Sequence, residues 1–206
     1  MSKADAKKQI IIEKLADHLL QHGMKESSLR QLAAAADMSD RMLLHYFTNK
    51  DELLTATLIL INARLITMLD STSSAQMHLK ILLPHLAQLI KNPLISPYLR
   101  LWLELVPLTA AENEPYLAIA KQICDTFFGK LTSMLKVERE EDRTTFASMA
   151  FAIIEGFVLL DALGLDTHIT NALKGIGTAR WADWCNVLTS LMKTKPVCPA
   201  YLPSAC

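Results

Sequence analysis

Residues 39–54, which read SDRMLLHYFTNKDELL, mix side chains that can contact a nucleic acid with side chains typical of a protein core. Arg41 can hold the edge of a guanine through two hydrogen bonds. Asp40 can accept a hydrogen bond from a cytosine amino group, or it can simply favour the N-terminus of a helix. Lys50 opens the next helical pattern, where a cation and unpaired backbone amides can converge on a phosphate. The chemistry that this stretch predicts is contact with an anionic partner.

Two short helices joined by three residues are expected to position these side chains. The first has a serine cap, either Ser27 or Ser28, and Gln31 completes a capping box if Ser28 is the cap. The second spans about 39–46 and begins after the N-cap Ser39. Two short helices separated by such a turn form a helix-turn-helix unit.

A helix-turn-helix unit can place its second helix in the major groove of DNA while the first crosses the backbone. Leu43 and Phe47 are expected to face inward and anchor this second helix. The residues predicted to contact DNA are Ser28, Arg30, Ser39, Asp40, Arg41, Met42, Leu44, His45, Tyr46 and Lys50.

The run over residues 22–58, HGMKESSLRQLAAAADMSDRMLLHYFTNKDELLTATL, closely resembles the N-terminal DNA-binding domain of the TetR family of bacterial transcriptional regulators. The family pattern has a glycine after the first helix and a Thr/Ser pair before a hydrophobic-Arg-x-hydrophobic-Ala segment. It ends in a Tyr-His-Tyr-Phe-like sequence followed by x-x-Lys-x-x-Leu. The matching residues here are Gly23, Ser27-Ser28, Leu29-Arg30-Gln31-Leu32-Ala33, Leu44-His45-Tyr46-Phe47, Lys50 and Leu53.

The resemblance implies an all-helical protein of about nine helices that forms homodimers through its last two long helices. It also implies a small-molecule pocket in the larger C-terminal part, which controls the affinity for DNA. Three residues depart from the family pattern. Asp37 replaces the usual glycine of the turn, Leu44 replaces a tyrosine that commonly contacts phosphate, and Asp40 stands where a cation is common. Fewer phosphate contacts, and a modest non-specific affinity for DNA, are therefore expected.

The rest of the chain is predicted to be helical as well, in an all-α fold. A first helix ends at Gly23, and Thr48 with Asp51 three residues later marks the start of a long helix over about 50–70. Further helices are expected over about 75–91, 97–108, 115–136, 142–164 and 179–194, with 167–178 as a loop containing a possible helical turn. The predicted domains are a three-helix DNA-binding domain over 1–50 and an effector-binding and dimerisation domain over 51–206.

The composition agrees with a helical protein and favours one cellular compartment. Only six glycines and eight prolines occur in 206 residues, and 51% of the residues are hydrophobic. The net charge is zero, so it gives no argument for nucleic acid by itself. The four cysteines have no metal-ligand spacing, and the N-terminus has no apolar signal, so reduced thiols in the cytoplasm are expected. The apolar run 146–165 contains Glu155 and Asp161, which favours a buried helix over a membrane span.

The C-terminal part is expected to hold an effector pocket and a dimer contact. The residues predicted for the pocket are His85, Trp102, Glu104 and Phe127, with Tyr98, Tyr116 and Phe128 as further candidates. Glu104 can instead pair with Arg100 or point to solvent. Helix 142–164 is apolar around most of its circumference, and helix 179–194 carries Trp181 and Trp184, so a symmetric four-helix contact between two copies is preferred over burial in a monomer.

Catalytic and metal sites are not expected, because the chain has no metal-ligand spacing, no nucleophile with a nearby base and no glycine-rich phosphate loop. No cofactor is predicted. The sequence predicts a dimeric regulator of transcription that binds a double-stranded DNA operator. It is expected to be a repressor released from a palindromic site by a small-molecule effector. The alternative is a helical adaptor that binds a protein partner and no DNA.

Overall fold

The computed structural model describes residues 3–72, 75–109 and 114–178, and these ranges are almost entirely helical. The described helices are α1 (Lys3–His22), α2 (Leu29–Ala35), α3 (Asp40–Tyr46), α4 (Lys50–Thr72), α5 (Leu79–Ile90), α6 (Ser96–Thr109), α7 (Glu114–Met134), α8 (Arg143–Ala162) and α9 (Asp166–Thr178), with the 3-10 turns η1 (Met24–Glu26) and η2 (Glu140–Asp142). Within these ranges the β structure amounts to one isolated bridge between Met77 and Leu135. The prediction of an all-α fold is confirmed.

The short helices α2 and α3 begin where their serine caps place them. The Ser28 hydroxyl accepts a hydrogen bond from the Gln31 amide, and the Gln31 side chain accepts one from the Ser28 amide. This is the predicted capping box, with Ser28 as the cap. The Ser39 hydroxyl accepts from the Met42 amide at 3.2 Å and starts α3. Each cap satisfies a backbone donor that a helix of only seven residues would otherwise leave unpaired.

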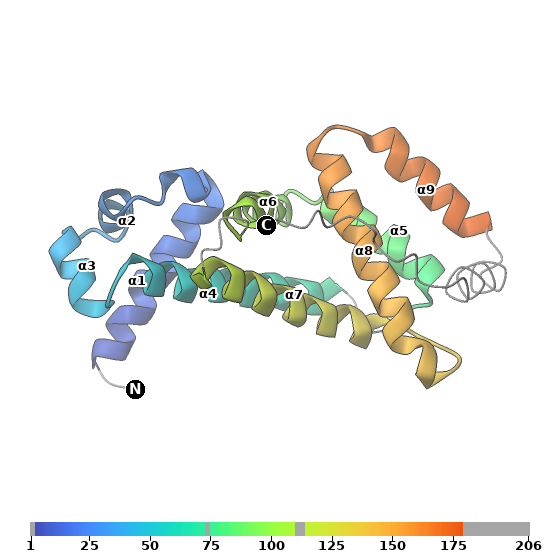
Figure 1. The fold of residues 1–206 in the computed structure, drawn as a ribbon, viewed down its shortest axis with the longest axis horizontal. Helices are drawn as coiled ribbons and strands as arrows, with labels where there is room; N and C mark the ends of the chain where they lie inside the picture. The colour runs from blue at the N-terminus through green and yellow to red at the C-terminus, as the bar shows by residue number, and fades with distance from the viewer. Residues whose placement is uncertain (1–2, 73–74, 110–113, 179–206) are drawn as a thin grey trace, which may run out of the picture.

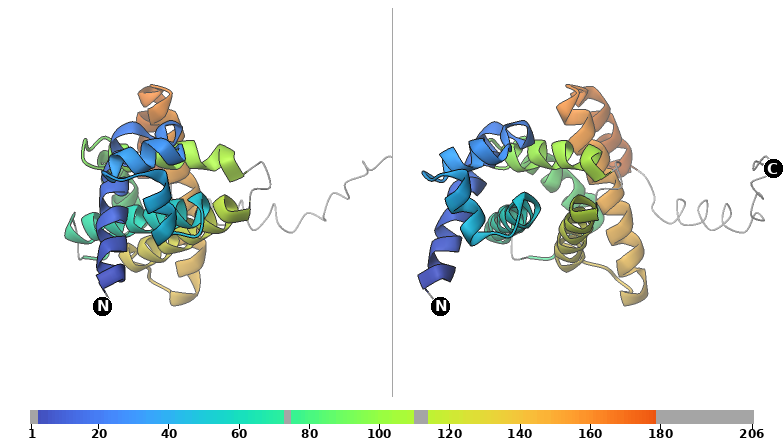
Figure 2. Two further views of the ribbon diagram at one scale, coloured as in Figure 1. Left: turned by 90° about the vertical axis from the view of Figure 1, so that its left-hand side faces the viewer. Right: turned by 60° about the vertical axis from the view of Figure 1, so that its left-hand side comes forward.

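The helices are arranged along one long axis (Figures 1 and 2). Helices α1, α2 and α3 lie at one end, and α5, α8 and α9 lie at the other (Figure 1). Helices α4 and α7 run lengthwise between the two ends and pack against each other. Helix α6 contacts α1 and η1 on one side and α7 and α8 on the other. It therefore links the two ends of the molecule.

Two hydrophobic clusters form the core. The first joins the N-terminal helices to the body, because Leu15, Leu43 and Leu58 pack in the same cluster as Leu101 of α6 and Ile119 of α7. The second lies at the far end and is built from α5, α7, α8 and α9, with Leu82, Leu131 and Ala150 fully buried. On the surface beside the first cluster, Arg64 of α4 forms ion pairs with Glu13 and Asp17 of α1.

One predicted loop is a helix. Residues 167–178, which contain Gly175 and Gly177, were expected to be a loop with a possible helical turn, yet Asp166–Thr178 forms α9. Ile169 is buried and Leu173 and Ile176 are partly buried against the second cluster, so tertiary packing outweighs the low helix propensity of glycine. The helix predicted for 179–194, with Trp181 and Trp184, lies outside the described residues.

Two helical segments are long and apolar enough to cross a membrane by length and composition alone, Lys50–Ser71 and Glu140–Ala162. The core helix of a globular protein meets the same criteria. Both segments contribute to the core here: Leu53 and Leu58 of the first and Ala147 and Ile154 of the second are buried.

Candidate nucleic-acid interface and ligand cavity

Helix α3 lies at the outer end of the molecule (Figure 1), and most of its predicted contact residues face solvent. Asp40, Arg41 and His45 are exposed, and the apolar side chains of Met42 and Leu44 are 52% and 43% exposed. Exposed apolar side chains next to a cation suit the major groove, where thymine methyl groups lie beside hydrogen-bonding base edges.

The opposite side of α3 holds the helix in place. Leu43 is fully buried and Phe47 is 3% exposed, in the cluster that also contains Leu32 and Ala33 of α2. Tyr46 at the end of the helix is partly buried against the same cluster. The predicted inward anchors, Leu43 and Phe47, are therefore confirmed, and they fix the direction in which the exposed side chains point.

The turn between α2 and α3 uses an unusual conformation at Asp37. Its φ is 56°, and it is the one non-glycine residue with a positive φ in the described ranges. This is the left-handed conformation, which an aspartate tolerates at some cost and which suits a position where glycine is usual in the family. Lys14 of α1 forms an ion pair with Asp37, and this contact lowers the pKa of the Asp37 carboxyl group.

The start of α4 is capped one residue later than predicted. The Asn49 side chain accepts a hydrogen bond from the Glu52 amide at 2.8 Å, and the Glu52 carboxylate accepts from the Thr48 amide at 2.6 Å. Asn49 and Glu52 thus act where Thr48 and Asp51 were expected. Lys50 is the first residue of the helix, and its cation is partly exposed. The backbone amides of Thr48 and Glu52, on either side of Lys50, therefore already donate hydrogen bonds within the protein.

Several cations at this end of the molecule have no carboxylate partner in the described part of the chain. Within the described residues, Arg30, Arg41 and Lys50 form no ion pair with a carboxylate, whereas Lys14 is paired with Asp37. A cation that is not neutralised internally keeps its charge available for a phosphate or a base edge.

Helix α6 is hydrogen-bonded to the end of α1 and to η1. The Arg100 guanidinium donates to the carbonyl oxygens of Leu20 at 2.7 Å and of Gln21 at 3.3 Å. The Glu104 carboxylate accepts from the Met24 amide at 2.6 Å. These bonds satisfy backbone groups that the end of α1 leaves unpaired. They fix the N-terminal helices directly on α6.

The opposite side of α6 faces a cavity. Its lining comes from α4, α5, α6, α7 and α8, and the space not filled by atoms amounts to about 910 Å³ with its open mouth included. Most lining side chains are aliphatic or aromatic, as is usual for small-molecule sites. The lining residues with a polar group are Asn62, Tyr98, Trp102, Cys124 and Glu155.

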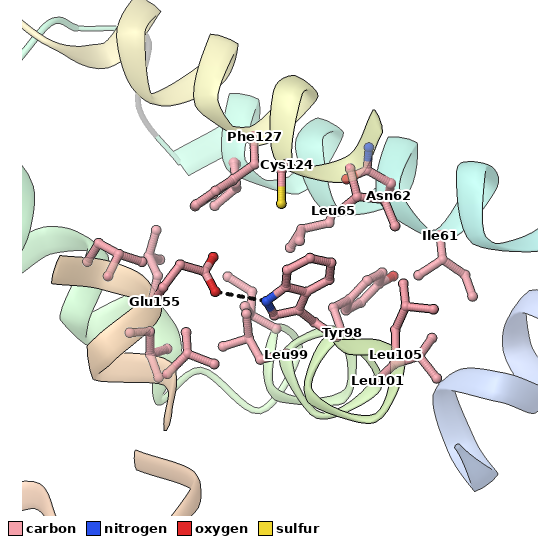
Figure 3. A pocket seen from close by; sticks show the side chains of 18 of the residues that line it. Ile61, Asn62, Leu65, Tyr98, Leu99, Leu101, Leu105, Cys124, Phe127 and Glu155 are labelled. Carbon is pink, nitrogen blue, oxygen red and sulfur yellow. Dashed lines mark hydrogen bonds between the residues drawn. The ribbon is translucent and has the colours of Figure 1, made fainter. Parts of the chain in front are cut away.

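Glu155 of α8 carries the charge of this cavity. Its Oε2 accepts a hydrogen bond of 2.8 Å from the Trp102 indole N–H, which is the dashed line in Figure 3. In the same view, Cys124 and Phe127 project from one helix and Tyr98 from another. Burial raises the pKa of Glu155, although the hydrogen bond from Trp102 lowers it. Burial likewise raises the pKa of the Cys124 thiol, and the charge of Glu155 adds to that rise.

Comparison with known proteins identifies the N-terminal part. The sequence profile described as "Bacterial regulatory proteins, tetR family" matches residues 11–57, the range that contains α2, α3 and the ends of α1 and α4 that pack on them. Residues 11–57 therefore form a TetR-family N-terminal domain. Domains of this family are DNA-binding helix-turn-helix domains of transcriptional regulators, and the family is not one of enzymes.

Solved structures share the fold over most of this chain. The multidrug binding protein EbrR, in complex with proflavin, is 20% identical with a TM-score of 0.62, over 82% of this chain and 99% of that one. A transcriptional regulator from Rhodococcus sp. Rha1 is 21% identical with a TM-score of 0.62, over 84% and 98%. The fatty acid degradation regulator FadR from Bacillus halodurans is 15% identical with a TM-score of 0.51, over 84% and 96%. At these identities the likeness shows the fold alone. No curated protein sequence matches the chain significantly.

The residues predicted for the effector pocket fall into two groups. Trp102 and Phe127 line the cavity. Glu104 lies outside it on the Met24 amide, and His85 lies outside it on α5, with its Nε2 buried and without a hydrogen-bond partner among the described residues.

Sequence reasoning missed Glu155 as a pocket residue. An acid in the middle of an apolar helix was the available signal, and it served as an argument against a membrane span. The same signal also indicates a polar function, because an ionisable side chain on an apolar helix face is costly to bury without a partner.

Proposed function

We propose that the chain is a homodimeric repressor that binds a palindromic operator through α2, α3 and the start of α4. In this proposal an effector in the cavity beside α6 releases the protein from DNA. The observation that carries the proposal is the position of α3. Leu43 and Phe47 fix its inner side, while Arg41 is exposed and has no carboxylate partner among the described residues.

The assignments on α3 follow from the chemistry of its exposed side. Arg41 is assigned to a guanine edge, and Met42 and Leu44 are assigned to apolar contacts such as thymine methyl groups. Arg30 and Lys50 are assigned to phosphates on the two sides of the groove. Ser28 and Ser39 already accept hydrogen bonds at the helix starts, and their hydroxyl groups remain exposed for a phosphate oxygen.

The contact between the two copies is assigned to α8. Ala152, Gly156, Leu159 and Leu163 lie four, three and four residues apart and are exposed, with Leu159 51% and Leu163 63% accessible. This spacing places them along one helix face, and the two small residues permit close approach of a second helix. A second copy would bring two α3 helices to successive major grooves, about 34–36 Å apart.

The assignment of the cavity to an effector is supported by its apolar lining and its position against α6. EbrR, which shares the fold, is a multidrug binding protein solved with proflavin. By analogy of site, a ligand that binds one conformation of α6 better would shift the population toward that conformation. Arg100 and Glu104 on the other side of α6 would carry such a shift to the end of α1.

A DNA-binding measurement with the upstream region of the chain's own operon tests the main proposal. Arg41→Ala plus Lys50→Ala is expected to reduce the affinity through the lost base contact, and to reduce the salt dependence because the lost Lys50 phosphate contact lowers the slope of log K against log salt by about 0.9. Lys80→Ala plus Lys136→Ala removes the same charge from exposed positions far from α3 and serves as the control. Unchanged binding by the first double variant would remove these residues from the interface.

Sedimentation of the purified chain tests the dimer. Leu159→Glu is expected to shift the protein from dimer to monomer and to weaken operator binding, because it places a charge in the proposed contact. Leu94→Glu introduces the same charge at a residue that is 72% exposed and lies outside α8, and it should leave the dimer intact. A dimer that survives Leu159→Glu would place the contact elsewhere.

A further inference from the structure

The cavity combines an apolar wall with a single acidic group. Among its described lining residues Glu155 is the one Asp or Glu, and none is Lys, Arg or His. The lining includes four aromatic side chains: Tyr98, Trp102, Phe127 and Phe151. Such a site differs from an ordinary apolar core, in which polar side chains are rare and paired.

Glu155 is incompletely compensated in the described part of the chain. The Trp102 indole donates one hydrogen bond to its Oε2, and no ion pair with a described Lys, Arg or His reaches either oxygen. A neutral indole donor stabilises a carboxylate less than a cation does. Glu155 is partly buried, and a carboxylate in such a place without a cationic partner costs free energy, so a glutamine would satisfy Trp102 at a lower cost. A positively charged ligand bound in the cavity would therefore complement the Glu155 carboxylate.

The remaining lining defines what that partner must look like. Trp102 and Phe127 offer aromatic faces, which attract organic cations and stack on planar rings. A strongly hydrated metal ion or polyamine would find one carboxylate and many aliphatic carbons, which cannot replace its hydration shell. A ligand with its own carboxylate, such as a fatty acid, would be repelled by Glu155. A neutral apolar ligand would leave the carboxylate unpaired.

We propose that the cavity binds a lipophilic organic monocation, with its positive charge against Glu155 and its aromatic or apolar body against Trp102 and Phe127. This rests on the proposed function only in assigning the cavity to an effector. The positive charge takes the place of the missing internal partner, and the body displaces water from the apolar wall. Binding therefore offsets the desolvation cost of the partly buried Glu155 carboxylate and also buries ligand surface.

Isothermal titration of the full-length protein with two matched probes tests the proposal. The first is 10-methylacridinium, which has a fixed positive charge, and the second is acridine at about pH 8, where it is neutral. Since an interaction with a charged group is commonly worth a factor of about ten or more, the wild type should bind the cation at least about tenfold more tightly. Tetraphenylphosphonium, a cation of different shape, controls for the outline of the cavity.

Glu155→Gln is the decisive variant because it keeps an acceptor for Trp102 and removes the charge. It should weaken binding of both cations at least about tenfold and leave acridine nearly unchanged. Glu138→Gln makes the same change in net charge at an exposed position and should leave all three affinities unchanged. Equal cation binding by wild type and Glu155→Gln overturns the proposal, as does the absence of binding of both cations by wild type.

The pH dependence of the wild type gives a readout that does not depend on a variant. The affinity for 10-methylacridinium should fall as the pH is lowered through the titration of Glu155, since the probe itself does not titrate. A flat profile overturns the proposal. Operator binding is measured separately. If cations bind in the cavity without changing operator affinity, this inference stands and the proposed effector mechanism is refuted. If a neutral ligand releases the operator independently of Glu155, the effector mechanism stands and this inference is refuted.

Discussion

Replacing Gly23 by alanine should be among the most destabilising single changes outside the deep core. Gly23 has φ 78° and ψ −177°, a backbone region that is essentially restricted to glycine. An alanine there costs roughly 1–3 kcal/mol of backbone strain. Its Cβ would also lie 2.5 Å and 2.7 Å from the two carboxylate oxygens of Glu104.

The second part of the cost comes from the bond that Glu104 makes. Its Oε2 accepts from the Met24 amide at 2.6 Å, and Met24 is 8% exposed. A carboxylate displaced by the new methyl group leaves this amide without its acceptor, which costs about 1–3 kcal/mol. Gly23→Ala is therefore expected to lower the free energy of unfolding by roughly 2–6 kcal/mol, a large part of the usual 5–15 kcal/mol of a folded protein.

Urea unfolding followed by circular dichroism measures this loss, and a double-mutant cycle separates its two parts. Each single variant loses the hydrogen bond between the Met24 amide and Glu104, but the double variant Gly23→Ala/Glu104→Ala loses that bond only once. Its free energy of unfolding should therefore be about 1–3 kcal/mol higher than the two single losses added together would give. Gly129→Ala is the control, because Gly129 is helical and a Cβ there meets nothing within 4 Å. It should stabilise by about 0.5–1 kcal/mol. A Gly23→Ala protein as stable as the wild type would refute the reasoning.

Three further predictions concern the turn, the anchor and the cavity. Asp37→Ala should lower the Tm more than Asp37→Gly, since both lose the ion pair with Lys14 but only glycine adopts positive φ without strain; equal losses would contradict the role of the backbone. Leu43→Ala should cost about 2–5 kcal/mol in urea unfolding, while Leu44→Ala, one residue on and exposed, should cost less than about 0.5 kcal/mol; comparable losses would contradict the orientation of α3. Burial raises the pKa of Glu155 above 4.5, so the native state holds a proton that the unfolded chain has released, and stability falls as the pH rises through the raised pKa. In ligand-free protein Glu155→Gln should therefore have the higher Tm at about pH 8, with a difference that shrinks toward about pH 4; a constant difference across this range would count against the buried charge.

The helix-turn-helix was predictable because its determinants are local. Ser28 with Gln31, and Ser39 with the amide of Met42 three residues later, specify the starts of α2 and α3 through residues close in sequence. The spacing of Leu43 and Phe47 assigns the inner side of α3. Asp37 was predictable as left-handed because the place in the turn demands it. Each of these features depends on residues that are near neighbours along the chain.

The cavity was only partly predictable because its polar contact joins distant residues. Trp102 and Glu155 are 53 positions apart, and nothing near either residue signals their hydrogen bond. Glu104 was weighed as an effector ligand, a partner of Arg100 or a solvated side chain, and it binds the Met24 amide, 80 positions away. Helix α9 was expected only as a possible helical turn, although Ile169, Leu173 and Ile176 have helical spacing.

The continuous core beneath α1 has a consequence for protein engineering. Leu101 and Leu105 of α6, with Ile119 of α7, complete the cluster that holds the N-terminal helices. A chimera that transplants residues 1–50 onto the body of another regulator would leave that apolar surface without its native cover. A working graft must carry the matching faces of α6 and α7, together with Arg100 and Glu104, as part of the transplanted unit.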